Sequence, residues 1–401
     1  MKKSIGLMIS TMNSGGAERV VSHLSHILSK DYDVHVILFE DTFMEYECGG
    51  TVHSLNTPAK SCSLIVKLRL LLRRISALKR LIREEKLSCV VSFLDSPNFV
   101  NLLARVKGCR KVISIRNYSD LENRQNAFMR LVDLAMKLFY RKADCVVTVS
   151  RLIEHSFRSY YNIPAERITT IYNPYNFDDI RRKGEMPLSD NEQAFFDGHF
   201  VFSNVGRIVY QKAAWHLVKA FAKVHEKHPD ARLVIVGEDR TDGKLTTLVD
   251  ALGLADAVLM TGRTKNPYQY MKNSDCYVLS SLFEGFPNAM VEAMACGCPT
   301  VAADCKSGPR EILFREPDLN ATITEVTRAD YGLLVPDLEA EEGWDPTVFT
   351  EGEEKLAEAM CSVMENADER AHLAADAEKR SRDFDFEACH KSYTNIIESE
   401  E

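Results

Sequence analysis

Several features are missing from this chain of 401 residues. No apolar run approaches the roughly 18 residues of a membrane-spanning helix, so we expect none. The 11 cysteines are odd in number, scattered and without a CxxC pair, which predicts reduced thiols in a cytoplasmic protein. No GxGxxG motif is present, which argues against NAD-dependent redox chemistry. The start, MKKSIGLMISTM, has too short an apolar stretch for a signal peptide and predicts a first strand.

The charge of the chain is divided unevenly along its length. Up to residue 175 there are 26 Lys and Arg against 16 Asp and Glu, a balance of +10. The remainder has 24 against 42, a balance of −18. Length and opposite charge predict two domains with different partners, the basic half favouring an anionic surface. We expect no nucleic-acid partner.

The first half alternates buried-strand patterns with helical ones, the order of a doubly wound parallel sheet. We expect strands at 4–12, 34–39, 89–94, 111–115, 144–150 and 168–172. Helical patterns occupy 17–30, 63–83 and 125–141. Polar loops that end such strands lie at the carboxyl edge of the sheet, where ligands bind. Asp95, Arg116 and Asn117 are therefore candidate sugar or acceptor contacts, although loops are polar for other reasons too.

The second half repeats this architecture without repeating the sequence. Strands are expected at 200–205, 232–236, 258–260, 276–282, 299–303 and 331–335. Helices are expected at 213–227, 245–252, 289–296, 353–379 and 384–397. The charged stretch 176–199 between the halves, which contains Pro and Gly, predicts a linker.

The run EGFPNAMVE, from Glu284 to Glu292, follows the apolar stretch 276–282 and opens a helical pattern. A strand, a Gly/Pro turn and a helix point free backbone N–H groups toward an anion. With Glu284 on the turn and Glu292 about one turn into the helix, both carboxylates can reach one crevice. A carboxylate is a good acceptor for a vicinal diol such as that of ribose.

This run, continued by MACGCPTVAADCKSGPREIL, resembles the signature of the large retaining glycosyltransferase family with the GT-B fold, often called family 4. The resemblance implies an α/β protein with two Rossmann-like domains facing a deep interdomain cleft. An acceptor domain would span 1–175 and a nucleotide-sugar domain 200–380. A C-terminal helix, 381–401, would cross back to the first domain.

The resemblance also assigns roles to individual residues. Gly206-Arg207 and Gln211-Lys212 match an element whose Arg and Lys hold the diphosphate of the donor, so that Arg207 and Lys212 would stabilise the leaving group. Glu284 would lie beside the sugar and Glu292 would bind the ribose. Further donor contacts would come from Gly15, Gly16, Arg263, Gly285, Phe286, Pro287 and Asn288.

Two features of the resemblance bear on chemistry. We see no Mg²⁺-binding Asp-x-Asp motif beside these elements, and Arg and Lys can neutralise the phosphate, so no metal and no cofactor besides the donor are expected. Many family members carry a His near the sugar where this chain has Arg116-Asn117. Asn can hydrogen-bond a hydroxyl group but cannot act as a base, which leaves the donor sugar open.

The stretch 63–83 carries Leu or Ile every three or four residues, with Lys and Arg between them. A basic amphipathic helix can lie on an anionic membrane surface. It can equally be a domain helix whose cations are solvated, and the two interpretations can coexist.

The leading hypothesis is a retaining, metal-independent hexosyltransferase. It would move a hexose or N-acetylhexosamine from a nucleotide sugar, with UDP favoured, to a polyprenyl-diphosphate-linked or oligosaccharide acceptor. Such an enzyme of bacterial surface glycan synthesis would be cytoplasmic and peripheral on the inner face of the membrane. The alternatives are a catalytically silent nucleotide-sugar-binding protein and a GT-B nucleotide-sugar epimerase.

Overall fold

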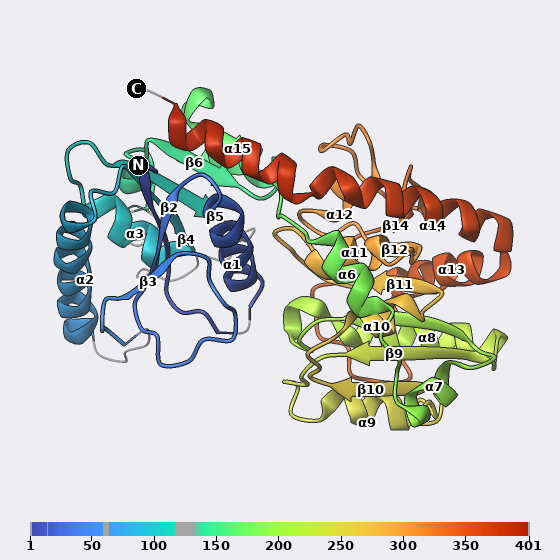
Figure 1. Cartoon of the computed structure of the whole chain (residues 1–401). Helices are drawn as coiled ribbons and strands as arrows, with labels where there is room; N and C mark the ends of the chain where they lie inside the picture. Colours follow the sequence, from blue (N-terminus) through green and yellow to red (C-terminus); the bar gives the residue numbers. More distant parts are fainter. Residues whose placement is uncertain (1, 14, 59–63, 117–133, 135, 400–401) are drawn as a thin grey trace. The chain divides into compact units, whose positions relative to one another are not determined.

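A computed structural model describes residues 2–13, 15–58, 64–116, 134 and 136–399 (Figure 1). The chain divides into two compact units. Unit 1 comprises Met1–Tyr175 together with Phe386–Glu401, and unit 2 comprises Asn176–Asp385. The C-terminal helix therefore belongs to the unit that contains the N-terminus.

Unit 1 is built on a seven-stranded sheet in the order β3-β2-β1-β4-β5-β6-β7, in which every neighbouring pair is parallel. Its strands are β1 (Ser4–Ile9), β2 (Asp33–Leu38), β3 (Thr51–Ser54), β4 (Cys89–Phe93), β5 (Arg110–Ile115), β6 (Cys145–Thr148) and β7 (Ile168–Thr170). The inner strands are almost wholly buried apolar runs, as expected for a parallel sheet covered on both faces. The sequence analysis missed β3, because this short polar edge strand carries no apolar signal.

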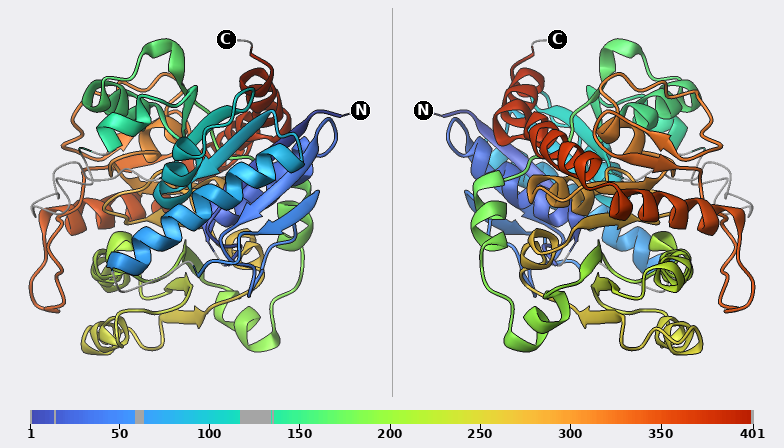
Figure 2. Two further views of the ribbon diagram at one scale, coloured as in Figure 1. Left: turned by 90° about the vertical axis from the view of Figure 1, so that its left-hand side faces the viewer. Right: turned by 90° about the vertical axis from the view of Figure 1, so that its right-hand side faces the viewer.

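The helices of unit 1 are α1 (Gly16–Leu28), α2 (Leu64–Glu84), α3 (Asp95–Leu103), α5 (Arg151–Tyr161) and α15 (Phe386–Glu398), with a 3₁₀ turn at Ala165–Arg167. Helix α2 packs on the sheet through Leu78, Leu81 and Ile82, and the left view of Figure 2 shows it in front of the strands. Helix α15 buries Tyr393 and Ile397 in the core that α1 also covers.

The loop expected after β4 is in fact the first turn of α3, which begins at Asp95. Pro97 is tolerated there because the first turn needs no backbone donor. Asn98 is buried and accepts a hydrogen bond from Ser92 Oγ at 2.8 Å, while it donates to the carbonyl of Ser114. The polar residues that suggested a loop therefore anchor a helix to β4 and β5.

Unit 2 has a second seven-stranded sheet, in the order β10-β9-β8-β11-β12-β14-β13. Its strands are β8 (Phe200–Val205), β9 (Ala231–Val236), β10 (Val258–Gly262), β11 (Cys276–Leu279), β12 (Thr300–Ala303), β13 (Thr327–Arg328) and β14 (Leu333–Val335). All pairs are parallel except β13 with β14. The two-residue β13 was not expected from the sequence.

The helices of unit 2 are α6 (Phe177–Gly184), α7 (Asp190–Phe196), α8 (Ala214–Lys227), α9 (Lys244–Ala251), α10 (Tyr268–Lys272), α11 (Asn288–Ala295), α12 (Pro309–Leu313), α13 (Glu351–Glu365) and α14 (Ala367–Ser381). Two 3₁₀ turns lie at Tyr210–Lys212 and Arg382–Phe384. Among the described residues, no helix is both long and apolar enough to cross a membrane.

The stretch 176–199 is not the irregular linker that its composition suggested, because it forms α6 and α7 and belongs to unit 2. Asn176 caps α6 by accepting a hydrogen bond from the backbone N–H of Asp179. Ser189 and Glu192 form a capping box at the start of α7. The stretch expected to be a linker therefore contains two capped helices.

The single long helix expected at 353–379 is two helices, α13 and α14. Asn366 breaks it with non-helical backbone angles, φ −110° and ψ 88°. The side chain of Asn366 accepts a hydrogen bond from the backbone N–H of Glu369, which makes it the N-cap of α14. Helical periodicity continued across this residue and concealed the break.

Candidate functional site

The carboxyl ends of β8 and β9 approach each other very closely at two glycines. The backbone N–H of Gly206 donates to the carbonyl of Val236 at 2.9 Å. A Cβ atom on Gly237 would lie 1.9 Å from the carbonyl oxygen of Gly206, so only glycine fits at this position. This close contact fixes the start of the loop that carries Arg207 and Lys212.

Lys212 forms an ion pair with Glu284, 2.6 Å from Nζ to Oε1. Their side chains are 20% and 8% exposed, so the pair is largely shielded from water but remains open at the lysine. Ser281 Oγ donates to the same carboxylate oxygen at 2.7 Å. Two residues that the sequence analysis placed in the site from separate motifs, 72 positions apart, are thus in contact.

The backbone between Lys212 and α8 is strained. Ala213 is fully buried and adopts a left-handed conformation, with φ 45° and ψ 47°. Such a conformation costs a non-glycine residue about 1–3 kcal/mol and is found most often at functional sites. Gln211 holds the other side of the turn, since Nε2 donates to the carbonyl of Phe283 at 2.8 Å.

The loop after β12 contacts and stabilises the turn that carries Glu284. Glu284 donates its backbone N–H to the carbonyl of Lys306 at 2.8 Å. Ser307 Oγ donates to the carbonyl of Gly285 at 2.8 Å and also lies 3.1 Å from that of Glu284. A Cβ atom on Gly308 would lie 2.4 Å from Cδ of Pro287. The sequence analysis quoted this Ser-Gly-Pro run but did not single out its residues.

Glu292 lies in the second turn of α11 and is buried. Burial raises the pKa of Tyr277, and the carboxylates of Glu284 and Glu292 raise it further. The charges of both carboxylates therefore act on one buried tyrosine. Phe286 is buried beside them, in an edge contact with Phe384 at 5.3 Å between ring centroids.

The rim of this region is cationic. Arg207 and Arg263 are both exposed. The hydrogen bond from Arg240 lowers the pKa of Glu238, and the charges of Arg263 and Arg207 lower it further. Three strand ends thus bring guanidinium groups to one carboxylate on the surface. Gly262, with φ 69°, supplies the turn before Arg263.

The first turn of α11 begins at Asn288, directly after Pro287 as N-cap. The N-cap side chain makes no capping hydrogen bond. The N-terminal N–H groups of a helix carry partial positive charge and bind phosphate well. The turn of Gly285, Phe286 and Pro287 therefore places the N-terminus of α11 next to the Lys212–Glu284 pair.

The candidates in unit 1 have different surroundings. Gly15 is the N-cap of α1 and Gly16 its first residue. Asp95 accepts a hydrogen bond from Tyr140 at 2.9 Å. Arg116 is buried, hydrogen-bonded to Asn173, and burial lowers the pKa of its guanidinium. Asn117 lies outside the described residues.

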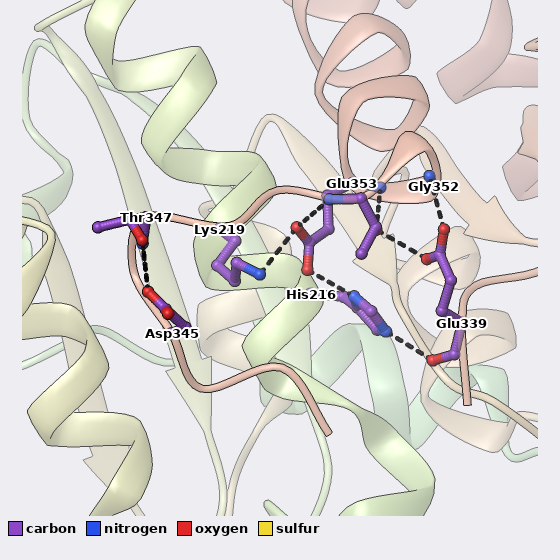
Figure 3. Close-up of polar contacts among 8 residues, drawn as sticks. His216, Lys219, Glu339, Asp345, Thr347, Gly352 and Glu353 are labelled. Carbon is purple, nitrogen blue, oxygen red and sulfur yellow. Dashed lines mark hydrogen bonds and ion pairs between the residues drawn. The ribbon is translucent and has the colours of Figure 1, made fainter. Parts of the chain in front are cut away.

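Unit 2 also contains a buried polar network that sequence reasoning did not find (Figure 3). Glu353 at the start of α13 binds His216 Nδ1 at 2.8 Å and Lys219 Nζ at 3.0 Å, both on α8. All three side chains are at most 1% exposed. His216 Nε2 lies 2.9 Å from the carbonyl of Glu339, which ties the 339–353 segment to α8. Because His216 lies one turn after Lys212, the network holds in place the helix that follows the site.

The arrangement around Lys212 suits a substrate with a negatively charged leaving group. Two models of protein families match the chain, "Glycosyltransferase Family 4" over residues 14–179 and "Glycosyl transferases group 1" over residues 186–329. A curated glycosyltransferase of Methanocaldococcus jannaschii, itself uncharacterized, is 31% identical over 82% of this chain and 83% of its own.

The chain belongs to the group 1, family 4 glycosyltransferases.

A second relative of this glycosyltransferase is an N-acetylgalactosaminyltransferase of Campylobacter jejuni, whose name describes action on a diphospho-undecaprenol-linked sugar. It is 32% identical over 77% of this chain and 83% of its own. Among solved structures, Rickettsia africae glycosyltransferase has a TM-score of 0.75 at 17% identity, covering 99% of this chain and 98% of its own. Anabaena HepE with UDP-glucose has 0.74 at 19%, covering 98% and 99%. The glycosyltransferase therefore has the GT-B fold, as predicted.

Proposed function

We propose that this glycosyltransferase moves a hexose or N-acetylhexosamine from a UDP-sugar to a polyprenyl-diphosphate-linked glycan, with retention of anomeric configuration. The observation that carries the proposal is the Lys212–Glu284 ion pair beside the start of α11. In this proposal the pair joins the cation that would bind the diphosphate to a carboxylate suited to sugar hydroxyl groups. The support for donor and acceptor comes from the relatives, which include HepE with UDP-glucose bound and the Campylobacter enzyme.

In the proposed reaction the bond between the anomeric carbon and the β-phosphate oxygen breaks, and a bond to the acceptor oxygen forms on the same face. The acceptor proton passes to the departing phosphate. Negative charge grows on that phosphate, so preorganised cations and N–H donors lower the barrier. Arg207, Lys212 and the first N–H groups of α11 would supply them. No resident metal is part of this proposal.

When no donor is bound, Glu284 neutralises the positive charge of Lys212. A diphosphate entering the site would compete for the ammonium group, and the carboxylate would then be free to accept hydrogen bonds from sugar hydroxyls. Glu292 would hold the ribose in the same pocket.

Transfer of radiolabelled sugar from UDP-linked donors to a short polyprenyl-diphosphate disaccharide tests this function. We expect product with the α-linkage of the donor, no dependence on added Mg²⁺, and loss of transfer in Glu284→Gln. Donor hydrolysis without transfer would point to another acceptor. Binding without any turnover would support a silent sugar-binding protein, and transfer from GDP-sugars alone would overturn the choice of UDP.

The basic helix α2 supports a membrane-linked acceptor. Ile65, Leu68 and Leu72 are 66%, 58% and 60% exposed and share one helix face. Cations flank them at Lys67, Arg69 and Arg73. An apolar stripe between cations is the pattern of helices that lie at an anionic lipid surface. We propose that this part of α2 rests on such a surface and brings the enzyme to its lipid-linked substrate.

A further inference from the structure

His35, His53 and Glu85 gather beside the edge strand β3 of the sheet of unit 1. His35 is the third residue of β2 and His53 the third of the four residues of β3, and they are two positions apart in register because His53 pairs with Ile37. Ile37 packs against Leu78 and Ile82 of α2, so this sheet face is the one that α2 covers. Glu85 directly follows α2. Three segments therefore bring two imidazoles and a carboxylate together.

The ligand atoms of these three residues all lie within 4.8 Å of one another. His35 Nδ1 and His53 Nε2 are 2.9 Å apart. Two imidazole nitrogens that bind one tetrahedral zinc at about 2.0 Å are separated by about 3.3 Å. The observed pair would need to open by only a few tenths of an ångström to admit the ion between its nitrogens.

The remaining nitrogen of His35 supports the same arrangement. His35 is 3% exposed, and within the described part of the chain its Nε2 atom has no hydrogen-bond partner. Nε2 lies 3.4 Å from Oδ2 of Asp33. A metal-binding histidine typically directs its other ring nitrogen to a carboxylate, which fixes the tautomer that leaves the first nitrogen free to bind.

Glu85 directly follows the C-terminal end of α2, whose helix dipole places partial negative charge beside this group and so favours a bound cation.

We propose that His35 Nδ1, His53 Nε2 and the Glu85 carboxylate bind Zn²⁺, with water at the fourth position. Two imidazoles and one carboxylate suit zinc and disfavour Mg²⁺, which prefers oxygen ligands. The ion would tie edge strand β3 to the C-terminal end of α2. The proposal does not rest on the transferase activity.

A second candidate metal-binding group, in unit 2, must be distinguished from this one in any experiment. His228, Cys361 and Glu365 also place their ligand atoms within 4.8 Å. This group contains a thiol and the first does not. A Co²⁺ ion bound by a thiolate shows sulfur-to-metal charge transfer, whereas Co²⁺ on nitrogen and oxygen ligands shows only d–d bands. Spectroscopy with Co²⁺ thus distinguishes the two sites.

The test is titration of the metal-stripped full chain with Co²⁺ and then with competing Zn²⁺, followed by thermal unfolding with and without Zn²⁺. We expect intense tetrahedral d–d bands without charge transfer, displaced by one equivalent of Zn²⁺, and a higher unfolding midpoint with Zn²⁺. Cys361→Ser should leave both results unchanged. The exposed His26→Gln is the matched control.

Among variants of the site, Asp33→Asn should weaken Zn²⁺ binding roughly 10- to 100-fold, the effect of removing an outer partner. His53→Gln and Glu85→Gln should weaken it at least as much. Glu85 is only partly buried, at a helix end, so its variant keeps the test valid if His53→Gln does not fold. The proposal is overturned if the wild type shows no d–d bands, if the bands require Cys361, or if both ligand variants bind as the wild type does.

Discussion

Arg207 and Lys212 differ in how deeply they are buried, which separates their effects on turnover and folding. Changing either residue to Ala should lower turnover by roughly 10²-fold or more, which is the loss typical of removing one preorganised donor. Arg207 is exposed, so Arg207→Ala should keep its unfolding temperature. Steady-state transfer assays and thermal melts check both effects, with the exposed Lys227→Ala on α8 as control.

Lys212→Ala should also lower the unfolding temperature, because it leaves the buried Glu284 carboxylate with Ser281. The double variant Lys212→Ala/Glu284→Gln should regain that stability without regaining turnover. Near-normal turnover in either single variant would remove that residue from the site.

Glu292→Gln tests the ribose contact. A charge-assisted hydrogen bond is worth about 1.5–3 kcal/mol, so the donor KM should rise by about 10-fold or more while the acceptor KM hardly changes. The wild type should prefer UDP over its 2′,3′-dideoxy analogue more strongly than the variant does. Equal discrimination by the two proteins in competition assays would show that Glu292 does not bind the ribose.

Asp337, just after β14, makes unit 2 sensitive to pH. Burial raises its pKa to about 6, and the nearby Asp304 adds to the increase. The folded protein therefore holds this proton at pH values where the unfolded chain, with a pKa of about 4, has lost it. Stability should fall as pH rises from about 4 to about 6. Asp337→Asn should flatten this part of the profile in melts across pH, whereas an unchanged profile would assign it to other groups.

At the scale of elements, the Glu353 network connects α8 to α13 and the segment before it. Both oxygens of Glu353 have cationic or imidazole partners in a site without water access. Glu353→Ala would leave Lys219 buried without its counter-charge, so we expect a loss of about 3–5 kcal/mol in denaturant unfolding. The exposed Glu351→Ala, also in the first turn of α13, should cost far less. Similar costs for both would mean that the network is not a principal support of α8.

Helix α2 allows charge and apolar contact to be tested separately. The protein should sediment with vesicles that contain anionic lipid, much less with neutral ones, and high salt should release it. Arg69, Arg73 and Arg80 changed to Gln should weaken binding through charge. Leu68 and Leu72 changed to Ser should weaken it through lost apolar insertion, while Val348→Ser, also exposed, serves as control.

Neither set of α2 changes should affect transfer to a short water-soluble acceptor analogue. Equal binding to neutral and anionic vesicles, or none to either, would leave α2 as an ordinary domain helix.

At the scale of the whole molecule, the sequence predicted the strands and helices that contain long apolar runs. The inner strands of both sheets, α8 and α11 all lie within a few residues of their expected bounds. The strands β3 and β13 were missed because two to four mostly polar residues at a sheet edge carry no pattern. A charged stretch with Pro and Gly concealed α6 and α7, whereas helical periodicity across Asn366 concealed the break between α13 and α14.

The candidate site was predictable where one motif carries one role, as in Gly-Arg, Gln-Lys and Gly-Phe-Pro. The supports were not, because they join distant segments. Ser307 contacts a carbonyl 22 positions away, and His216 meets Glu353 across 137. Such pairs depend on the packing of the finished fold. The roles of the site residues themselves stay predictions until variants are assayed.

The cysteines have a practical consequence at this scale. Ten thiols in the described segments are free, and all except Cys48 are buried. Burial also raises the pKa of thiols such as Cys89 and Cys296, each to about 12, so almost no thiolate is present at neutral pH. Alkylating reagents can therefore reach these sulfurs only when the surrounding structure opens.

Unit 1 carries four of the buried thiols and unit 2 five: Cys89, Cys109, Cys145 and Cys389 in the first, and Cys276, Cys296, Cys298, Cys305 and Cys361 in the second. The order in which these thiols are alkylated therefore reports the order in which the two units unfold. No cysteine has to be introduced for this measurement.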